Sequence, residues 1–186
     1  MGTTGRPVGS DPGRPHSASE TLIRPETPRD VDAITAINVA AFAGRPYSRQ
    51  TEHLIVAALR DADALSVSLV AVRDGRPVGH VAFSEAAVGE MAEGWYLAGP
   101  VAVLPEFQHQ GIGSLLMSSG LGELRARQAA GCVLVGDPGF YRRFGFDVHP
   151  GLVHKGVPDE FVLGLSFGDE VPAGEIAAHR AFETTT

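Results

Sequence analysis

The most informative stretch of the sequence is a polar turn with two glycines that stands between an apolar strand and an apolar helix. It lies within Val101–Leu116, VAVLPEFQHQGIGSLL, and places Gly111 and Gly113 where the helix should begin. Glycine at such a position costs about 1 kcal/mol relative to alanine, so a ligand that approaches the backbone closely is one reason to keep it. The first turn of a helix presents unpaired N–H groups and the positive end of the helix dipole. The expected ligand is therefore a phosphate group.

Three known phosphate-binding motifs compete for this turn. A dinucleotide-binding fingerprint fits poorly, because Leu116 occupies the third glycine position and residues 105–110 separate the strand from Gly111. A P-loop fits poorly as well, because no Lys-Ser or Lys-Thr pair follows Gly113. The third motif agrees with the residues on both sides of the turn.

That third motif belongs to a family of acetyltransferases. The run QHQGIG, residues 108–113, resembles the Gln/Arg-x-x-Gly-x-Gly/Ala motif of the GNAT N-acetyltransferase family, whose members bind acetyl-coenzyme A (acetyl-CoA). Further along the chain, GFYRRFGF (139–146) resembles the family's second signature, a short helix with an aromatic pair that ends in Gly-Phe. Together, VLPEFQHQGIG and VLVGDPGFYRRFGF most resemble the YhbS-like members, and the resemblance covers about residues 21–167.

Periodicity and turn residues predict the elements that position these motifs. Apolar residues at helical spacing predict helices over Pro28–Ala43, over Ser48–Leu59, and from the glycine turn to about Ala130, the last with a buried stripe of Ile112, Leu115, Leu116 and Leu124. Strand-like runs cover Thr21–Thr27, Leu65–Val88 around an Asp74-Gly75 hairpin turn, Gly94–Leu104, Cys132–Gly136 and Glu160–Phe167. Asp137, Pro138 and a closing glycine predict a short helix over Pro138–Phe144.

The order of these elements also matches the family. The resemblance implies the α/β class and the GNAT acyl-CoA N-acyltransferase fold, a mixed central sheet of about six to seven strands with a splayed strand pair, flanked by about four helices. Gly99-Pro100 interrupts one strand, and because proline donates no backbone hydrogen bond, we expect a bulge or an edge there. We expect one domain over residues 21–186, preceded by a disordered tail over residues 1–20, which are mostly Gly, Pro, Ser and Thr.

The resemblance also implies where acetyl-CoA would bind. Backbone N–H groups of the turn would hold the pyrophosphate, and the residues concerned are Gln108, His109, Gln110, Gly111, Ile112, Gly113 and Ser114. A strand splayed at Gly99-Pro100 would expose backbone at Val101, Ala102 and Val103, where Val101 and Val103 would pair with the amides of the pantetheine arm.

The implied reaction is acetyl transfer to a primary amine, by direct attack in a ternary complex. Tyr141 stands where the family often places its general acid, and backbone N–H groups near Val101 would stabilise the oxyanion. A tyrosine of pKa about 10 that protonates a thiolate of pKa about 8.5 works uphill by about 2 kcal/mol, so a hydrogen bond from Tyr141 to the sulfur is the alternative to full proton transfer. Cys132 opens an apolar strand and is predicted to be a buried, inert thiol rather than an acyl-enzyme nucleophile. The sequence identifies no general base.

Composition excludes several other functions. The 186-residue chain carries a net charge of −7, which argues against nonspecific binding to nucleic acid. No apolar run approaches a membrane span or a signal peptide, and the histidines show no zinc-ligand spacing, so we expect no membrane partner and no metal. The single cysteine excludes an internal disulfide and fits the cytoplasm.

The acceptor stays open at this point. It is either a small-molecule amine or a protein lysine, and the protein would act as a monomer or homodimer. The alternative to an enzyme is a non-catalytic acyl-CoA-binding or sensor module on the same fold.

Overall fold

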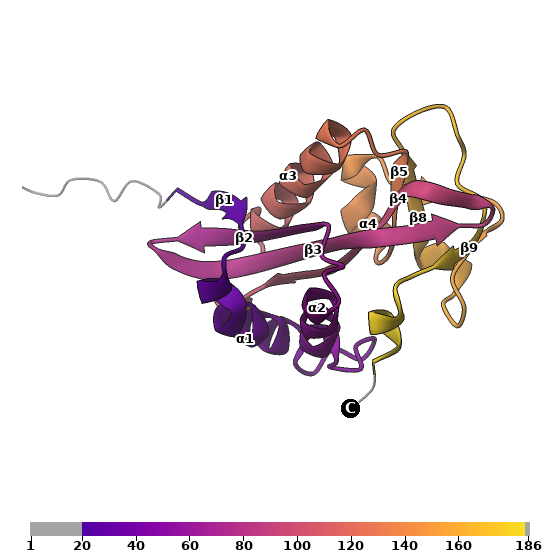
Figure 1. Cartoon of the computed structure of the whole chain (residues 1–186). Coiled ribbons are helices and arrows are strands. Elements are labelled where there is room, and N and C mark those ends of the chain that lie inside the picture. Colours follow the sequence, from indigo (N-terminus) through magenta and orange to yellow (C-terminus); the bar gives the residue numbers. More distant parts are fainter. Residues whose placement is uncertain (1–19, 185–186) are drawn as a thin grey trace, which may run out of the picture.

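The computed structural model describes residues 20–184, which fold around one twisted sheet (Figure 1). Its main path has the order β1-β2-β3-β4-β5-β8-β6, in which β4 and β5 are parallel and the other neighbours antiparallel. The strands of this path are β1 (Leu22–Pro25), β2 (Val67–Arg73), β3 (Arg76–Val88), β4 (Met91–Val103), β5 (Gly131–Val135), β8 (Val162–Ser166) and β6 (Asp147–Val148). Two more short strands, β7 (Leu152–Val153) and β9 (Gly174–Ala177), pair beside it. The predicted tail lies, except for Glu20, outside the described residues.

Helices cover both faces of the sheet. Figure 1 shows α1 (Val31–Phe42) and α2 (Glu52–Asp61) on one side, with α3 (Ile112–Ala126) and α4 (Pro138–Tyr141) on the other. Two neighbouring residues of β3 confirm this arrangement: Gly79 lies against Leu116 of α3, and His80 meets Asn38 of α1. Adjacent residues of a strand point to opposite faces. The predicted α/β fold class, with a seven-strand path and four α-helices in residues 20–184, is confirmed.

Helix α3 packs unusually closely on the sheet. A Cβ atom placed on Gly120 would lie 2.2 Å from Cε2 of Phe83, so the ring of β3 occupies the space that any side chain would need. The buried residues of α3 are Ile112, Leu116, Met117, Gly120, Leu121 and Leu124. The absence of a side chain at Gly120 therefore lets the large apolar ring fill the interface between helix and sheet.

Three sequence predictions need correction. Leu115, expected in the buried stripe, is 46% exposed, because the 100° turn per residue places it beside the stripe. Helix α3 ends at Ala126 rather than near Ala130, since Gln128 adopts a positive φ of 58° and closes the helix. The helix expected over 138–144 is α-helical only to Tyr141 and continues as a 3₁₀ turn over Arg142–Phe144.

A buried polar cluster joins β1, β2 and β3 beneath α1. Asn38 Nδ2 lies 3.4 Å from Nδ1 of the fully buried His80, whose Nε2 lies 2.9 Å from the Ser68 hydroxyl. Because an amide nitrogen only donates, His80 accepts at Nδ1 and carries its proton on Nε2. The Ser68 hydroxyl donates to Glu26, which also accepts two hydrogen bonds from Arg60, both 2.9 Å long.

The cluster shifts the pKa of both titratable side chains at its centre. Burial lowers the pKa of His80 below its usual value, although neighbouring Glu26 opposes the change. Burial alone would raise the pKa of Glu26, but the nearby His80 ring, whose Nε2 lies 3.7 Å away, and hydrogen bonds from Arg60 and Ser68 outweigh it and lower that pKa to about 2. At neutral pH the folded protein therefore holds a neutral histidine beside an ionised carboxylate.

The longest of the described helices, α3, has 15 residues, and none of them has the length and apolar character of a membrane-spanning helix.

The close approach of α3 to β3 gives a stability prediction. Gly120→Ala should lower the free energy of unfolding by about 1–3 kcal/mol, because its methyl group overlaps the Phe83 ring. Gly122→Ala, two residues along the same helix, meets open space and should raise stability by up to about 1 kcal/mol. Urea unfolding of both variants checks this. Equal effects of the two substitutions would show that α3 does not press on Phe83.

The buried His80 predicts a pH dependence of stability. Its folded pKa lies below the unfolded value of about 6.5, so the unfolded chain binds more protons as the pH falls through that value. The free energy of unfolding should be greatest above pH 7 and fall between pH 6.5 and 5, by at most about 1.4 kcal/mol per pH unit. Glu26 contributes little there, because its stabilisation is lost only as the pH falls below about 4.5.

Urea midpoints at pH 7.5, 6.5 and 5.5 measure this slope. His80→Gln should flatten it, whereas His53→Gln, on α2, should keep the wild-type slope. A wild-type slope in His80→Gln would assign the pH dependence to other groups.

Candidate functional site

The site begins where two parallel strands separate. β4 pairs with β5 only from Trp95 to Leu97, opposite Gly131 to Val133. Beyond that point β4 keeps its pairing with β3, while β5 continues beside β8. The edges of β4 and β5 therefore diverge, which is the splayed pair that the resemblance implied.

A bulge at Gly99-Pro100 causes the divergence. Val81 of β3 pairs with Val101, and Phe83 pairs with Ala98, so Gly99 and Pro100 together stand opposite a single residue of β3. Such an insertion bends a strand and increases its twist. The break expected from the sequence is thus a β-bulge inside the sheet rather than the end of a strand.

Beyond the bulge, one edge of the β4 backbone faces the gap that separates β4 from β5. The N–H of Leu104 donates to the Val78 carbonyl of β3 over 2.9 Å. Because amide groups alternate along a strand, those of Val101 and Val103 point away from β3 and those of Ala102 toward it. The side chain of Gln108 reaches into this opening, where its Nε2 donates to the Val103 carbonyl over 2.9 Å. The sequence named Val101, Ala102 and Val103, and the backbone amide groups of Val101 and Val103 face the gap, whereas those of Ala102 face β3.

The glycine turn gathers free backbone donors beside this edge. Gly111 has a left-handed φ of 83° and is the N-cap of α3, whose first hydrogen bond runs from the Leu115 N–H to the Gly111 carbonyl. Within residues 20–184, no backbone N–H from His109 to Ser114 donates a hydrogen bond to another residue. Consecutive free N–H groups at a helix N-terminus form an anion-binding site.

Gly113, in the first turn of α3, lies close to both the open strand β4 and the short helix α4. A Cβ atom there would lie 3.5 Å from Cζ of Phe140 and 3.9 Å from Cγ2 of Val103, both ordinary contacts. The position therefore tolerates a methyl group sterically. The turn, the open strand and the short helix α4 converge at this residue.

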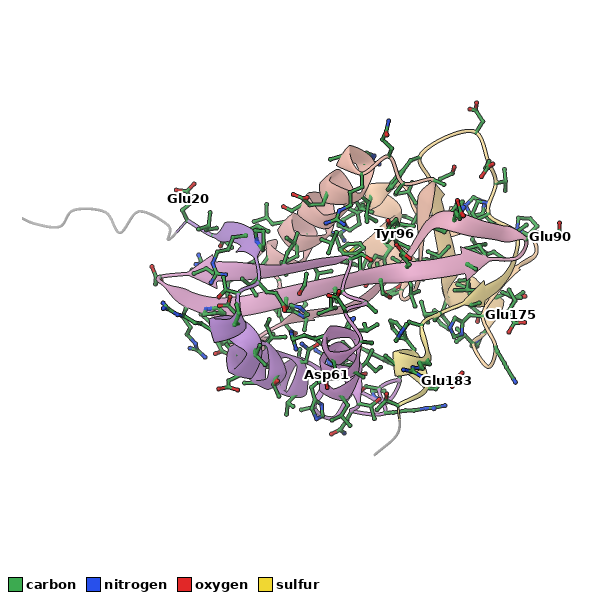
Figure 2. The ribbon with its side chains drawn as sticks, viewed as in Figure 1. Glu20, Asp61, Glu90, Tyr96, Glu175 and Glu183 are labelled. Carbon is green, nitrogen blue, oxygen red and sulfur yellow. The ribbon has the colours of Figure 1, made fainter. Side chains whose placement is uncertain are left out.

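Arginine side chains surround the turn of this acidic protein. Arg45 donates to the Oε1 of Gln108 over 3.1 Å, Arg73 donates to Gln110, and the Arg143 guanidinium lies 4.9 Å from the centre of the Phe140 ring. Acidic side chains are found at the other end of β4, where Figure 2 shows Glu90 and Glu175 near the β3–β4 hairpin turn. The guanidinium groups of Arg45 and Arg73 thus lie beside the free N–H groups, an arrangement that favours an anionic ligand.

Tyr141 is held rigidly beside the gap. The Asp137 carboxylate accepts a 2.8 Å hydrogen bond from the Gly139 N–H and so caps α4, as predicted from the sequence. The tyrosine ring lies directly over Gly136, where a Cβ atom would come within 2.3 Å of its Cε2. Phe140 packs edge-on against the same ring, with centroids 4.8 Å apart.

The environment of Tyr141 suppresses its ionisation. Burial raises the pKa of its phenol above the usual range, and negative charge on Tyr47, Cys132 or Asp137 would raise it further. Its hydroxyl has no hydrogen-bond partner among residues 20–184. Tyr141 is therefore a neutral phenol whose hydroxyl proton is not donated to any residue in this range.

Cys132 has the inert character predicted for it. The side chain is completely buried on β5, and burial raises the pKa of the thiol well above its usual value. The thiolate that a nucleophile requires is therefore inaccessible at neutral pH.

Other candidate groups lie apart from the turn. Glu85 and Glu93 line an open hollow of about 550 Å³ together with Trp95 and His179. In the part of the chain that the structure describes, no three His, Cys, Asp or Glu side chains cluster as metal ligands do. Sequence reasoning missed Gly136 and Arg45, since nothing in their local sequence marks the contacts that they make with Tyr141 and Gln108.

Comparison with known proteins agrees with this geometry. A family model described as "Acetyltransferase (GNAT) domain" matches residues 64–148. The chain is 45% identical to a GNAT family acetyltransferase from Brucella melitensis, solved in complex with acetyl-CoA, over 88% of this chain and 99% of that one, with a TM-score of 0.78. The Escherichia coli GNAT family N-acetyltransferase YhbS, solved in complex with CoA, is 29% identical over 94% of this chain and 98% of its own, with a TM-score of 0.82.

Curated sequences match over a shorter segment. The uncharacterized N-acetyltransferase YjhQ of Escherichia coli is 33% identical over 88 residues, which are 46% of this chain and 48% of YjhQ. YhbS of the same organism is 37% identical over 71 residues, 38% of this chain and 42% of YhbS. The matched segment thus spans about half the length of these curated relatives.

Proposed function

Because this chain belongs to the GNAT acetyltransferase family, we propose that it transfers the acetyl group of acetyl-CoA to a primary amine. One observation carries the proposal: a series of free N–H groups from His109 to Ser114 stands next to the open edge of β4. Pyrophosphate and pantetheine need these two surfaces side by side. The acetyl-CoA and CoA in the complexes of the two structural relatives support the same assignment.

The proposed cofactor contacts follow from the backbone. The free N–H groups of His109–Ser114 would hold the pyrophosphate, and Arg45 and Arg73 add positive charge nearby. Gln108, named with them from the sequence, donates its own N–H to the Pro105 carbonyl over 3.3 Å and is not one of these free donors. The amide groups of Val101 and Val103 would pair with the pantetheine arm as an added strand does. Since the Val103 carbonyl already accepts from Gln108, the N–H of Val103 and both groups of Val101 are the free partners.

Direct transfer to the amine is the proposed mechanism. Acetyl-CoA supplies a thioester, and the neutral amine would attack its carbonyl carbon to form a C–N bond and a tetrahedral oxyanion. As this intermediate collapses, the C–S bond breaks, coenzyme A leaves as the thiolate, and the nitrogen loses one proton to solvent, which balances the charge of the thiolate. An acyl-enzyme route would need a nucleophile, and the buried thiol of Cys132 does not qualify. The N–H of Val101 faces the gap, where it can donate to a developing oxyanion.

Tyr141 would act on the departing sulfur. Its raised pKa makes full proton transfer to the thiolate unfavourable, so the hydroxyl serves as a hydrogen-bond donor that becomes stronger as charge develops on sulfur. The rigid contact with Gly136 holds that donor in place. The acceptor is a small-molecule amine or a protein lysine.

Acetyl-CoA should stabilise the fold, and Gly113→Val should abolish the effect. A ligand that binds only the native state adds about 2.7 kcal/mol at a hundredfold excess over Kd, which thermal unfolding detects. The valine side chain would obstruct the phosphate while its Cβ makes only ordinary contacts, so the fold should survive. Gly122→Val places the same side chain in open space further along α3 and should keep full stabilisation. No shift with acetyl-CoA, together with a shift with NAD or ATP, would overturn the proposal.

Tyr141→Phe should reduce kcat and leave the Kd of acetyl-CoA unchanged. The substitution removes a group that acts on the leaving sulfur in the transition state, so kcat should fall by about 10- to 100-fold. Release of the CoA thiol measures the rate, with the best amine from a screened panel. Tyr96→Phe removes the same hydroxyl from the paired part of β4 and should retain kcat. An unchanged kcat in Tyr141→Phe would assign the ring to packing alone.

A further inference from the structure

The last residue of β5, Val135, points to the face of the sheet opposite the one that carries Tyr141. The next residue, Gly136, continues the pairing beyond β5, because its N–H donates to the Phe161 carbonyl over 2.9 Å. The ring of Tyr141 lies over Gly136, where a Cβ atom would come within 2.3 Å of its Cε2. Since successive residues of an extended strand point to opposite faces, the Val135 side chain lies on the far side of the sheet from Tyr141 and α4.

The neighbouring strands identify this face as the one that α1 and α2 cover. The indole of Trp95 lies over Gly131, where a Cβ atom would come within 2.4 Å of its Cζ3, so these two residues share a face. Trp95 stands opposite Ala86 of β3, which is on the same face as His80, the histidine that meets α1. Residues 131, 133 and 135 of β5 therefore all face α1 and α2.

Val135 is exposed because β4 has diverged from β5 at this point. Val133, two residues earlier, pairs with Leu97 of β4 and is fully buried, whereas Val135 lies beyond the last pair with β4 and is 42% exposed. Counting on from that last pair, Gly99 is the residue of β4 that faces Val135 across the gap. A Cβ atom on Gly99 would have no heavy atom of residues 20–184 within 4 Å, apart from its chain neighbours. Val135 therefore borders open space at the gap.

A second apolar side chain stands at the same end of β5. Phe161, whose carbonyl accepts the Gly136 N–H, is also 42% exposed. Covering such side chains with an apolar group removes hydrocarbon surface from water and is favourable. Bringing an ion against them is unfavourable, because the ion gives up water without gaining a hydrogen bond.

The proposed cofactor site leaves this face of the sheet to the amine. Helices α3 and α4 both lie on the other face, and with them the free N–H groups of the turn and Tyr141 (Figure 1). An amine that attacks a thioester in the gap must therefore come past Val135. It must also be neutral to attack, and apolar surroundings favour the neutral amine over the ammonium ion.

We propose that Val135 is a specificity-determining residue, which selects primary amines whose nitrogen is attached to an apolar carbon chain. The inference rests on the proposed function and narrows its acceptor. A second charge close to the nitrogen would have to give up its water against Val135. A lysine side chain meets the requirement, because its stem is a chain of methylene groups, whereas a short diamine does not.

Butylamine and propane-1,3-diamine are the probes, because they have the same chain length and differ only in a methyl or an ammonium group at the far end. The wild type should acetylate butylamine with a kcat/KM about tenfold greater. Val135→Thr, which replaces one methyl group with a hydroxyl of similar size, should reduce that ratio about fivefold through a loss with butylamine. Val135→Asp should reverse the preference, because its carboxylate can pair with the distal ammonium. Release of the CoA thiol measures the rates.

Val171 provides the matched control. It is an exposed valine in the segment between β8 and β9, so Val171→Thr should keep the wild-type ratio. The Kd of coenzyme A, measured by calorimetry, should be the same in Val135→Thr and wild type, since Val135 faces away from the side of the sheet that would hold the cofactor. A purely structural role of Val135 would slow both amines alike and leave their ratio unchanged.

The outcomes separate the two proposals. A wild type that prefers propane-1,3-diamine overturns the specificity, and so does an unchanged ratio in Val135→Thr, while the proposed function stands in both cases. If acetyl-CoA stabilises the protein and other amines are acetylated but butylamine is not, the specificity alone is wrong. If acetyl-CoA does not stabilise the protein and no amine is acetylated, both proposals are wrong.

Discussion

The site depends on one constraint, the inability of β4 to pair with β3 and β5 at once beyond the Gly99-Pro100 bulge. Proline supplies no N–H, and the two residues stand opposite one residue of β3, so the ladder loses its register at this point. Beyond the bulge β4 keeps only β3 as its partner, while β5 stays paired with β8 along its whole length. Backbone groups that a regular sheet would bury in pairing are thereby left available at Val101 and Val103.

Close contacts at two other glycines then set the positions of the groups around that opening. Gly120 allows α3 to press against Phe83, which aims the free N–H groups at its N-terminus toward the open strand. Because Gly136 has no side chain, the ring of Tyr141 packs directly on its backbone, and this contact fixes the position of the tyrosine beside the same gap. A side chain at Gly120 would overlap the Phe83 ring and one at Gly136 the Tyr141 ring, so either would displace α3 or Tyr141 from the open strand.

Much of this architecture was predictable from local sequence. The Asp74-Gly75 hairpin, the Asp137 cap and the glycine turn have their own conformational signatures, and the structure contains each of them. Short strands such as β6 and β9 escaped prediction, since two to four residues carry no periodicity and their pairing comes from distant partners. The placement of Leu115 failed for a related reason: which side of a helix is buried depends on the surface it packs against.

The sequence alone thus determined the order of the elements, the glycine turn before α3 and the break in β4, because each follows from residues that are neighbours along the chain. Only the tertiary structure decided which amides of β4 stay open and which side chains meet across the gap. Arg45 and Gln108, which are joined by a hydrogen bond, are separated by 63 positions, and Gly113 faces Phe140 of α4. No local pattern encodes such contacts, because they exist only after the sheet has brought distant segments together around the same opening.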